Sequence, residues 1–179
     1  MNERFRDPRG TWMSFLDEEI LVRCPDCQGC AVVAVHPRYD TQTAEPSYLG
    51  AFAPRRLVCS ACLLARDWPG KTIIRHSDAR DPYFGLPLWL QTRCGGNLLW
   101  AYGRRHLDLL EDYVTARHRE RGARPGSMSM VERLPTWLKS ARNRSEVLKA
   151  IRRIRRGTPP SRHRPEGSPT RAEAGRWGT

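Results

Sequence analysis

Two short stretches, Cys24-Pro25-Asp26-Cys27 and Cys59-Ser60-Ala61-Cys62, decide how this chain of 179 residues is organised. Each Cys-x-x-Cys motif points two thiols toward one place, and two such motifs can supply all four ligands of a tetrahedral metal ion. The 31 residues between Cys27 and Cys59 exceed a compact spacing of roughly 15–20, which a proline-containing loop at 36–54 accounts for. We therefore expect Cys24, Cys27, Cys59 and Cys62 to bind a structural Zn²⁺ ion with no open coordination position.

The other two cysteines, Cys30 and Cys94, leave a second kind of centre open. Cys24, Cys27 and Cys30 form a Cys-x2-Cys-x2-Cys run of the kind that holds iron–sulfur clusters. A ferredoxin-type run would continue with a cysteine at position 34, where this chain has Ala34. Zinc is therefore the favoured ion, and Cys30 and Cys94 are interpreted as small buried hydrophobic residues.

No segment of the sequence predicts export or a membrane span. Residues 1–8 have no apolar run of the signal-peptide kind behind them. The longest apolar run, at 30–35, is far too short to cross a bilayer. Without an export signal, paired Cys-x-x-Cys motifs are more typical of metal sites in a reducing compartment than of disulfides. We expect a cytoplasmic protein with no membrane partner.

The positive charge is concentrated in one block of the chain. Residues 117–164 hold 15 basic and 3 acidic residues, which accounts for the whole net charge of +12. Residues 1–116 are neutral, with 14 basic and 14 acidic residues. A block of one sign on an otherwise neutral protein is typical of a polyanion-binding surface, and a solubilising surface is the alternative.

The pattern around the two motifs predicts short antiparallel strands. We expect strands at 20–23 and 31–35 on either side of the first motif, and a strand at 55–58 that leads to the second. Pro69-Gly70 predicts a turn between 63–68 and 71–75, and therefore a hairpin.

A second hairpin is expected around Gly95-Gly96, which joins 88–94 to 97–102. Glycines supply the positive φ that a two-residue hairpin turn needs. A short helix at 86–90 is the competing interpretation. Before it, residues 81–87 form a loop rich in aromatic residues, which we expect to be ordered.

From residue 104 to about residue 121 the apolar spacing becomes helical, with Leu107, Leu110 and Val114 on one face. A break follows at 122–127, and Pro135 predicts a short helix over 134–138. Three acidic residues of the first helix could coordinate a cation, although a solvated helix face is the plainer interpretation: Asp108, Glu111 and Asp112.

A basic amphipathic helix is predicted from Asn143, in a capping box with Glu146, through Arg156 to Gly157. Its apolar stripe is Val147, Leu148, Ile151 and Ile154, opposite Lys149, Arg152, Arg153 and Arg156. Guanidinium groups suit phosphate oxygens. The residues expected to contact nucleic acid are Arg142, Arg144, Lys149, Arg152, Arg153 and Arg156.

The remaining residues carry weaker signals. Five aromatic side chains could stack on single-stranded bases, although a core position is the favoured interpretation: Tyr83, Phe84, Trp89, Trp100 and Tyr102. The histidines occur in no catalytic motif, and no phosphate-binding glycine loop is present. We therefore expect no enzymatic activity.

Several stretches of the chain carry a resemblance: the two cysteine motifs, Asp81-Pro-Tyr-Phe-Gly-Leu-Pro-Leu-Trp-Leu-Gln91, Leu99-Trp-Ala-Tyr102 and Leu134-Pro-Thr-Trp-Leu-Lys-Ser-Ala-Arg-Asn143. Over roughly residues 20–155 the chain resembles uncharacterised bacterial proteins that contain a zinc ribbon of the transcription factor IIB type. The resemblance implies a zinc ribbon in which Cys24, Cys27, Cys59 and Cys62 are the ligands, and it implies no activity.

Together these patterns predict an α+β protein: a zinc ribbon with short antiparallel hairpins, C-terminal helices and a disordered basic tail. The expected organisation is a lead at 1–19, a ribbon with hairpins and a packed helix at 20–121, a basic helical arm at 122–156 and a tail at 157–179. The expected function is nucleic-acid binding, to DNA or RNA, through the phosphate backbone, and a regulatory role is compatible with it. The alternative is a protein-docking adaptor of a larger complex.

Overall fold

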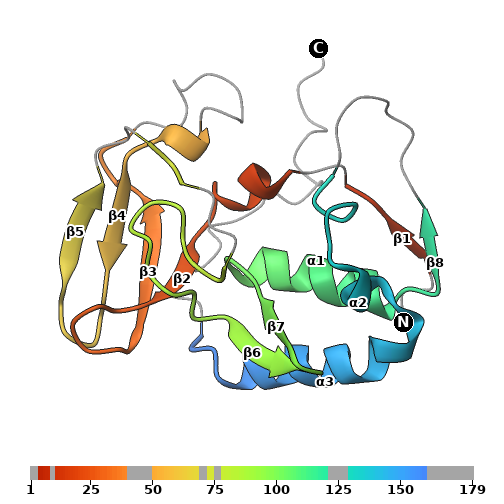
Figure 1. Ribbon diagram of the computed structural model, residues 1–179. Helices are drawn as coiled ribbons and strands as arrows, with labels where there is room; N and C mark the ends of the chain where they lie inside the picture. The colour runs from red at the N-terminus through yellow and green to blue at the C-terminus, as the bar shows by residue number, and fades with distance from the viewer. Residues whose placement is uncertain are drawn as a thin grey trace, which may run out of the picture.

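The computed structural model describes residues 4–8, 11–39, 50–68, 72–74, 78–120 and 129–160. It is a mixed α+β protein, which confirms the predicted class. A four-stranded sheet lies on one side, and the helices and a second hairpin lie on the other (Figure 1). Within the described ranges, none of the helices has the length and hydropathy that a bilayer crossing needs. The predicted disorder of the tail falls, from residue 161 on, outside the described residues.

The four-stranded sheet is an antiparallel meander in the order β2-β3-β4-β5. Its strands are β2 (Ile20–Arg23), β3 (Cys30–Val35), β4 (Arg55–Val58) and β5 (Ala65–Trp68). The first three were predicted from their β-branched and apolar runs. Alternate residues are buried on one face, as the two-residue period of a strand requires: Ile20, Val22, Ala31, Val33 and Leu57.

The partner of β5 differs from the prediction. Residues 65–68 pair with β4, with Leu57 opposite Arg66, and not with residues 71–75. Of the latter, residues 72–74 are described and form no strand. The reason is that the second cysteine motif is itself the hairpin turn: the chain reverses through Cys59–Cys62 and Leu63, whose φ is 63°.

The second predicted hairpin is confirmed, with β6 at Gln91–Cys94 and β7 at Asn97–Trp100. Gly95 and Gly96 have φ of 53° and 77°, so both turn positions are left-handed, as in a type I′ turn. The competing helix at 86–90 is absent, because Pro87 and Leu88 form bridges to Arg80 and Val22. The bridge from Leu88 to Val22 joins the segment before the hairpin to β2.

The ordered loop at 81–87 depends on one buried carboxylate. Asp81 is fully buried and accepts hydrogen bonds from the backbone N–H groups of Tyr83, Phe84 and Leu86 at 2.9, 2.8 and 2.6 Å. The hydroxyl of Tyr83 donates at 2.8 Å to the carbonyl of Ala51, the middle residue of the short 3-10 helix η2 (Gly50–Phe52). The loop is therefore fastened at both ends.

Helix α1 (Arg104–Thr115) is shorter than predicted. After Ala116 the chain becomes extended, and β8 (His118–Glu120) pairs in parallel with β1 (Arg4–Arg6). Phe5 of β1 meets the ring of Tyr113 edge-on at 5.3 Å, which fixes the N-terminal strand beside the end of α1. The helix ends where this pairing begins.

Helix α2 (Thr136–Lys139) follows Pro135 as predicted, and α3 spans Arg144–Arg156. The predicted capping box is not formed. Asn143 ends the 3-10 helix η3 (Ala141–Asn143) with φ −91° and ψ −2°, so it is already helical where a cap would be extended. Its amide instead donates to the carbonyl of Trp137 at 2.7 Å, which ties η3 back to α2.

Buried residues form two cores, and β2 lies between them. In the helical core, Leu107 and Leu110 of α1 pack with Val147 and Ile151 of α3, as the apolar stripe of α3 predicts. The sheet core lies under the four-stranded sheet and includes Phe15 of the 3-10 helix η1 (Trp12–Phe15). Leu21 belongs to the helical core, whereas its neighbours Ile20 and Val22 belong to the sheet core.

A close approach of backbone to backbone at Gly103 joins β2 to α1. A Cβ atom at Gly103 would lie 2.4 Å from the carbonyl oxygen of Glu19, so Gly103→Ala must push the two segments apart. We expect a loss of about 1–3 kcal/mol in the free energy of unfolding, measured by urea denaturation. The matched control is Gly157→Ala, whose Cβ would meet nothing closer than 3.7 Å. Equal stability of the two variants would contradict the expectation.

His106 is an imidazole in the first turn of α1 that is only 2% exposed. Its Nδ1 accepts the backbone N–H of Tyr102 at 3.2 Å, and its ring stacks on Phe15 with centroids 4.8 Å apart. Burial lowers its pKa to about 3. The ring is therefore neutral at physiological pH.

We expect the imidazole signals of His106 in NMR spectra to stay constant between pH 8 and pH 5. The histidine of an unfolded chain titrates near pH 6.5, so below that pH the unfolded state binds a proton that the folded state excludes. The free energy of unfolding should then fall as the pH falls, by up to about 1.4 kcal/mol per pH unit from this residue. A titration midpoint near 6.5 for His106 in the folded protein would refute its burial.

Candidate metal centre

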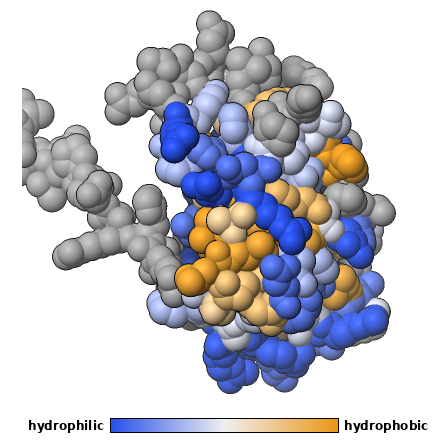
Figure 2. All heavy atoms as spheres, turned by 90° about the vertical axis from the view of Figure 1, so that its left-hand side faces the viewer, coloured by the Kyte–Doolittle hydropathy of each residue, from blue (hydrophilic) through white to orange (hydrophobic). Residues whose placement is uncertain are grey.

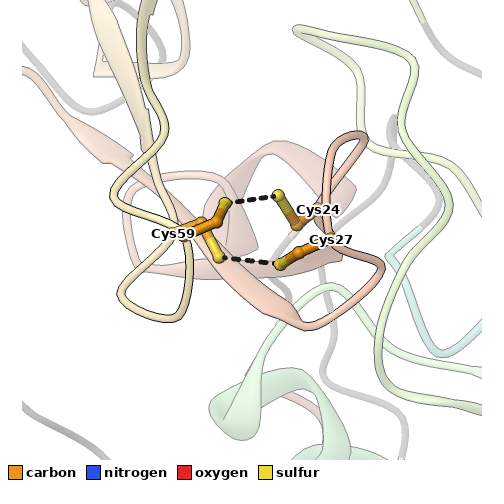
Figure 3. Close-up of side chains that lie close together, drawn as sticks. Cys24, Cys27 and Cys59 are labelled. Atoms are coloured by element: carbon orange, nitrogen blue, oxygen red, sulfur yellow. Dashed lines mark hydrogen bonds between the residues drawn. The ribbon is translucent and has the colours of Figure 1, made fainter.

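The four predicted ligands converge at one end of the four-stranded sheet. Cys24 follows β2 and Cys59 follows β4, so the two motifs form the β2–β3 and β4–β5 turns at the same end of the sheet. Cys24 and Cys27 on the first turn face Cys59 on the second (Figure 3). Cys62 completes the group, and the four sulfur atoms all lie within 4.8 Å of one another.

The two turns share one backbone design. The N–H of Cys24 donates to Gly29 O at 2.8 Å, and the N–H of Cys59, in the same position, donates to Leu64 O at 2.9 Å. The residue after each second cysteine is left-handed, with φ of 61° at Gln28 and 63° at Leu63. Neither is glycine, so the motifs alone gave no indication of this conformation. Two equal turns present two equal pairs of thiols.

The sulfur spacing fits a single tetrahedral ion. Sγ atoms are 3.6 Å apart between Cys24 and Cys62, and 3.5 Å apart between Cys27 and Cys59. Metal–sulfur bonds of about 2.3 Å in a tetrahedron put neighbouring sulfurs about 3.8 Å apart. An iron–sulfur cluster spreads its thiolates around several irons, for which this group is too tight. Cys30 lies outside the group, so the three-cysteine run does not act as one unit.

The centre is half shielded from solvent. Cys24 and Cys59, the first cysteine of each motif, are fully buried in the sheet core. Cys27 and Cys62 are exposed at the end of the sheet. A bound ion would therefore sit at the boundary between the sheet core and water, where it joins the two turns.

Crowding of the four sulfurs splits their acidities. Although burial acts to raise it, the pKa of Cys59 is lowered to about 7 by the N–H groups of Cys62 and Ala61 and by neighbouring thiols. The N–H of Leu64 acts to lower the pKa of Cys62, but burial and three neighbouring sulfurs raise it to about 12. Without a cation among them, the four thiols cannot all be deprotonated, because the negative charges would repel one another at this distance. A divalent cation bound among them would lower the pKa of all four thiols, because it stabilises every thiolate.

The acidic face of α1 is already occupied by a cation of the protein itself. The guanidinium of Arg155 on α3 lies 2.5 Å from Asp108 Oδ1 and 2.5 Å from Glu111 Oε2. This pairing engages two of the three carboxylates considered for a cation, and the third, Asp112, is exposed. Among the residues that the structure describes, the four-cysteine group is the only candidate metal site.

The structure places most of the predicted nucleic-acid contacts on the solvent side of α3. Arg142, Lys149, Arg152 and Arg156 are exposed. Arg153 is also exposed, and its Nη1 donates to Thr92 Oγ1 at 3.3 Å and to the carbonyl of Arg93 at 3.4 Å.

Arg144 differs from the other five. It is half-buried, and its Nη2 donates to the carbonyl of Ala116 at 3.0 Å. Ala116 is the residue at the C-terminal end of α1, so Arg144 provides a donor where helix carbonyls lack intrahelical partners. Its first role is to hold α3 to α1.

Two arginines from other parts of the chain lie beside α3, and the sequence did not single them out. Arg23, at the end of β2, and Arg153 line the same cleft of about 250 Å³. The guanidinium of Arg23 stands 5.3 Å from the ring centroid of Trp89, whose indole N–H donates to Gly157 O at 3.0 Å. Arg93 is exposed on β6. Only tertiary structure brings these residues together, so no local signal could have found them.

The five aromatic residues considered for base stacking divide into two groups. Tyr83 and Tyr102 are buried in the sheet core, as expected for core residues. Phe84, Trp89 and Trp100 are half-buried, each with part of its ring in a core and part at the surface.

Comparison with known proteins identifies no relative: no family model, no curated protein and no solved structure matches this chain. The resemblance to zinc-ribbon proteins therefore stays a prediction. What the protein does has to be argued from the site itself.

Replacement of one ligand tests the metal centre. Cys62→Ser removes an exposed thiolate, so we expect bound zinc to fall from one ion per chain to a small fraction, with affinity lower by more than about 100-fold. Metal analysis and the thiolate-to-cobalt charge-transfer absorption measure this. Cys30→Ser is the control and should keep the full metal content, because Cys30 lies outside the group. A well-folded, metal-free Cys62→Ser protein would show that the ion is not structural.

Proposed function

We propose that this protein is a non-enzymatic nucleic-acid-binding module in which a structural zinc ribbon supports an arginine-rich helix. The observation that carries the proposal is how the basic residues of α3 are partnered. Arg155 is neutralised by Asp108 and Glu111. Arg152 and Arg156, in contrast, are exposed and form no ion pair within the described part of the chain.

Phosphate is the partner that this surface suits best. Lys149, Arg152, Arg153 and Arg156 follow one side of a helix of 13 residues, which is about 20 Å long at 1.5 Å per residue. Arg23 and Arg93 extend the positive surface onto β2 and β6. Regularly spaced cations along a rod match the spacing of phosphates along a strand.

Zinc is the ion we propose for the four thiolates, because it favours tetrahedral sulfur coordination and fills all four positions with protein ligands. A closed site offers no position for substrate, which supports a structural ion. Four reduced thiols also fit a reducing compartment such as the cytoplasm. The exposed cations of α3 suit phosphate oxygens, and we identify no described side chain as a reader of base edges, which favours binding to DNA or RNA without strict sequence preference.

The salt dependence of binding tests this function. If roughly six phosphates are neutralised, log K should fall with log salt with a slope of about −5. The variant Lys149→Gln, Arg152→Gln, Arg156→Gln should make this slope less negative by about 3 units, because three phosphate contacts are lost. Fluorescence anisotropy with a labelled 20-base-pair duplex measures both slopes.

A second triple variant controls for net charge. Arg56→Gln, Arg80→Gln and Arg105→Gln remove three positive charges whose side chains already pair with carboxylates. The slope of this variant should stay near that of the parent protein. If the slope changed equally in both variants, the effect would be due to overall charge and not to the surface of α3. Binding by the parent protein that is absent or insensitive to salt would contradict the proposed function.

The second candidate function, a protein-docking adaptor, is favoured by a different observation. Figure 2 faces the side of the molecule formed by β4 and β5 and shows hydrophobic surface bordered by hydrophilic residues. Val58 of β4 and Leu63 of the second cysteine turn are 43% and 84% exposed. A leucine so exposed on a rigid turn suits burial in a partner.

The two functions separate in one experiment. After nuclease treatment, an adaptor should retain a stoichiometric protein partner. Leu63→Glu should abolish that association, and the α3 triple variant should leave it intact. If the protein instead binds nucleic acid, the α3 triple variant should lose affinity for nucleic acid and Leu63→Glu should keep it.

A further inference from the structure

A cavity of about 470 Å³ is bounded by Trp12 of η1 and by residues of β7, α1 and α2. Its size falls in the range of about 300–1,000 Å³ that is usual for small-molecule sites. Its lining combines five leucines, Met130 and Pro135 with four aromatic side chains and two basic ones. The aromatic and basic residues are Trp12, Trp100, Tyr102, Trp137, His106 and Arg133.

His106 is one of the lining residues and carries a buried hydrogen-bond donor. Its Nδ1 accepts the N–H of Tyr102, so in the neutral ring the proton is on Nε2. The Nε2 atom is buried and has no hydrogen-bond partner in the described part of the chain. A buried donor without an acceptor is rare and costs free energy, which a ligand with an acceptor would recover.

Arg133 adds a positive charge to the edge of the same cavity. Its side chain is exposed and forms no ion pair with any described residue. A matching ligand therefore has a flat ring for the aromatic walls, an acceptor that reaches His106, and an anionic group that remains near the surface. These three features occur together in a nucleotide.

We propose that this cavity binds an unpaired nucleobase, with a ring nitrogen or carbonyl oxygen accepting from His106 Nε2–H and the phosphate near Arg133. Stacking on aromatic side chains is the usual way in which proteins hold single-stranded bases. The base can belong to a polynucleotide or to a free nucleotide. The first form rests on the proposed function of α3, whereas the second does not depend on it.

The alternative is that the Nε2–H group of His106 is already satisfied by a contact within the protein. The ring of Trp100 lies 5.9 Å from the imidazole, centroid to centroid, at an interplanar angle of 89°. A ring face in this arrangement can take a weak N–H···π contact. In that case nucleotides would leave the Nε2–H environment unchanged, and the NMR signal of this group separates the two cases.

The experiment uses the zinc-loaded, full-length, ¹⁵N-labelled protein with three probes: AMP, a single-stranded (dA)10 oligonucleotide and a (dA)10·(dT)10 duplex. We expect AMP and the single strand to shift the His106 Nε2–H resonance. The single strand should also bind more tightly than the duplex. Trp137→Leu should weaken AMP binding about tenfold and leave duplex binding unchanged.

Arg133→Gln, with Arg80→Gln as its matched control, tests the phosphate contact without touching the core, because both side chains are exposed. Only Arg133→Gln should weaken AMP binding, and it should not affect adenosine. If AMP binds here but no polynucleotide binds at any salt concentration, the cavity is supported and the proposed function of α3 fails. If the duplex binds while no probe shifts the His106 signal, the inference is overturned and the proposed function stands.

Discussion

The convergence of four sulfur atoms at the end of one small sheet is the constraint on which the rest of the structure depends. The strands are only four to six residues long, and so few residues bury little surface of their own. Thiolates held this closely repel each other unless a cation lies among them. A cation bound among them would therefore stabilise the sheet, because it would offset the repulsion between the thiolates of the two turns.

The position of β2 carries that constraint into the other half of the molecule. Its residues alternate between the two cores, with Leu21 packing on the helical core and Ile20 and Val22 on the sheet core. Backbone hydrogen bonds leave the same strand for the hairpin segment, from Trp89 N–H to Leu21 O at 2.8 Å. The helices are thus packed against a strand whose far end is the metal centre, and the two halves share one structural element.

The features that depend on residues close together in the sequence could be predicted from the sequence alone. The clustering of the four cysteines, three strands, the Gly95-Gly96 turn and the amphipathic faces of α1 and α3 all follow from motifs or periodicity. Errors arose where distant contacts decide the outcome. The pairing of β8 with β1 ends α1 early, and η3 removes the extended conformation that Asn143 needed as a cap. Arg23 illustrates the same limit for the site, because its neighbours on α3 are more than a hundred residues away in sequence.

One contact described above links the metal to the basic surface. Arg23 directly precedes Cys24, and it stands over Trp89, whose indole is hydrogen-bonded to the carbonyl of Gly157 at the end of α3. If the four thiols bind an ion as proposed, its loss would free the first turn and, through this stack, increase the conformational entropy of the end of α3 that bears Arg153 and Arg156. A polyanion would then have to order the surface that it binds, at a cost in affinity. Under the proposed function, metal occupancy and polyanion affinity would be thermodynamically linked, so the supply of zinc would affect a surface that contains none of the four candidate ligands.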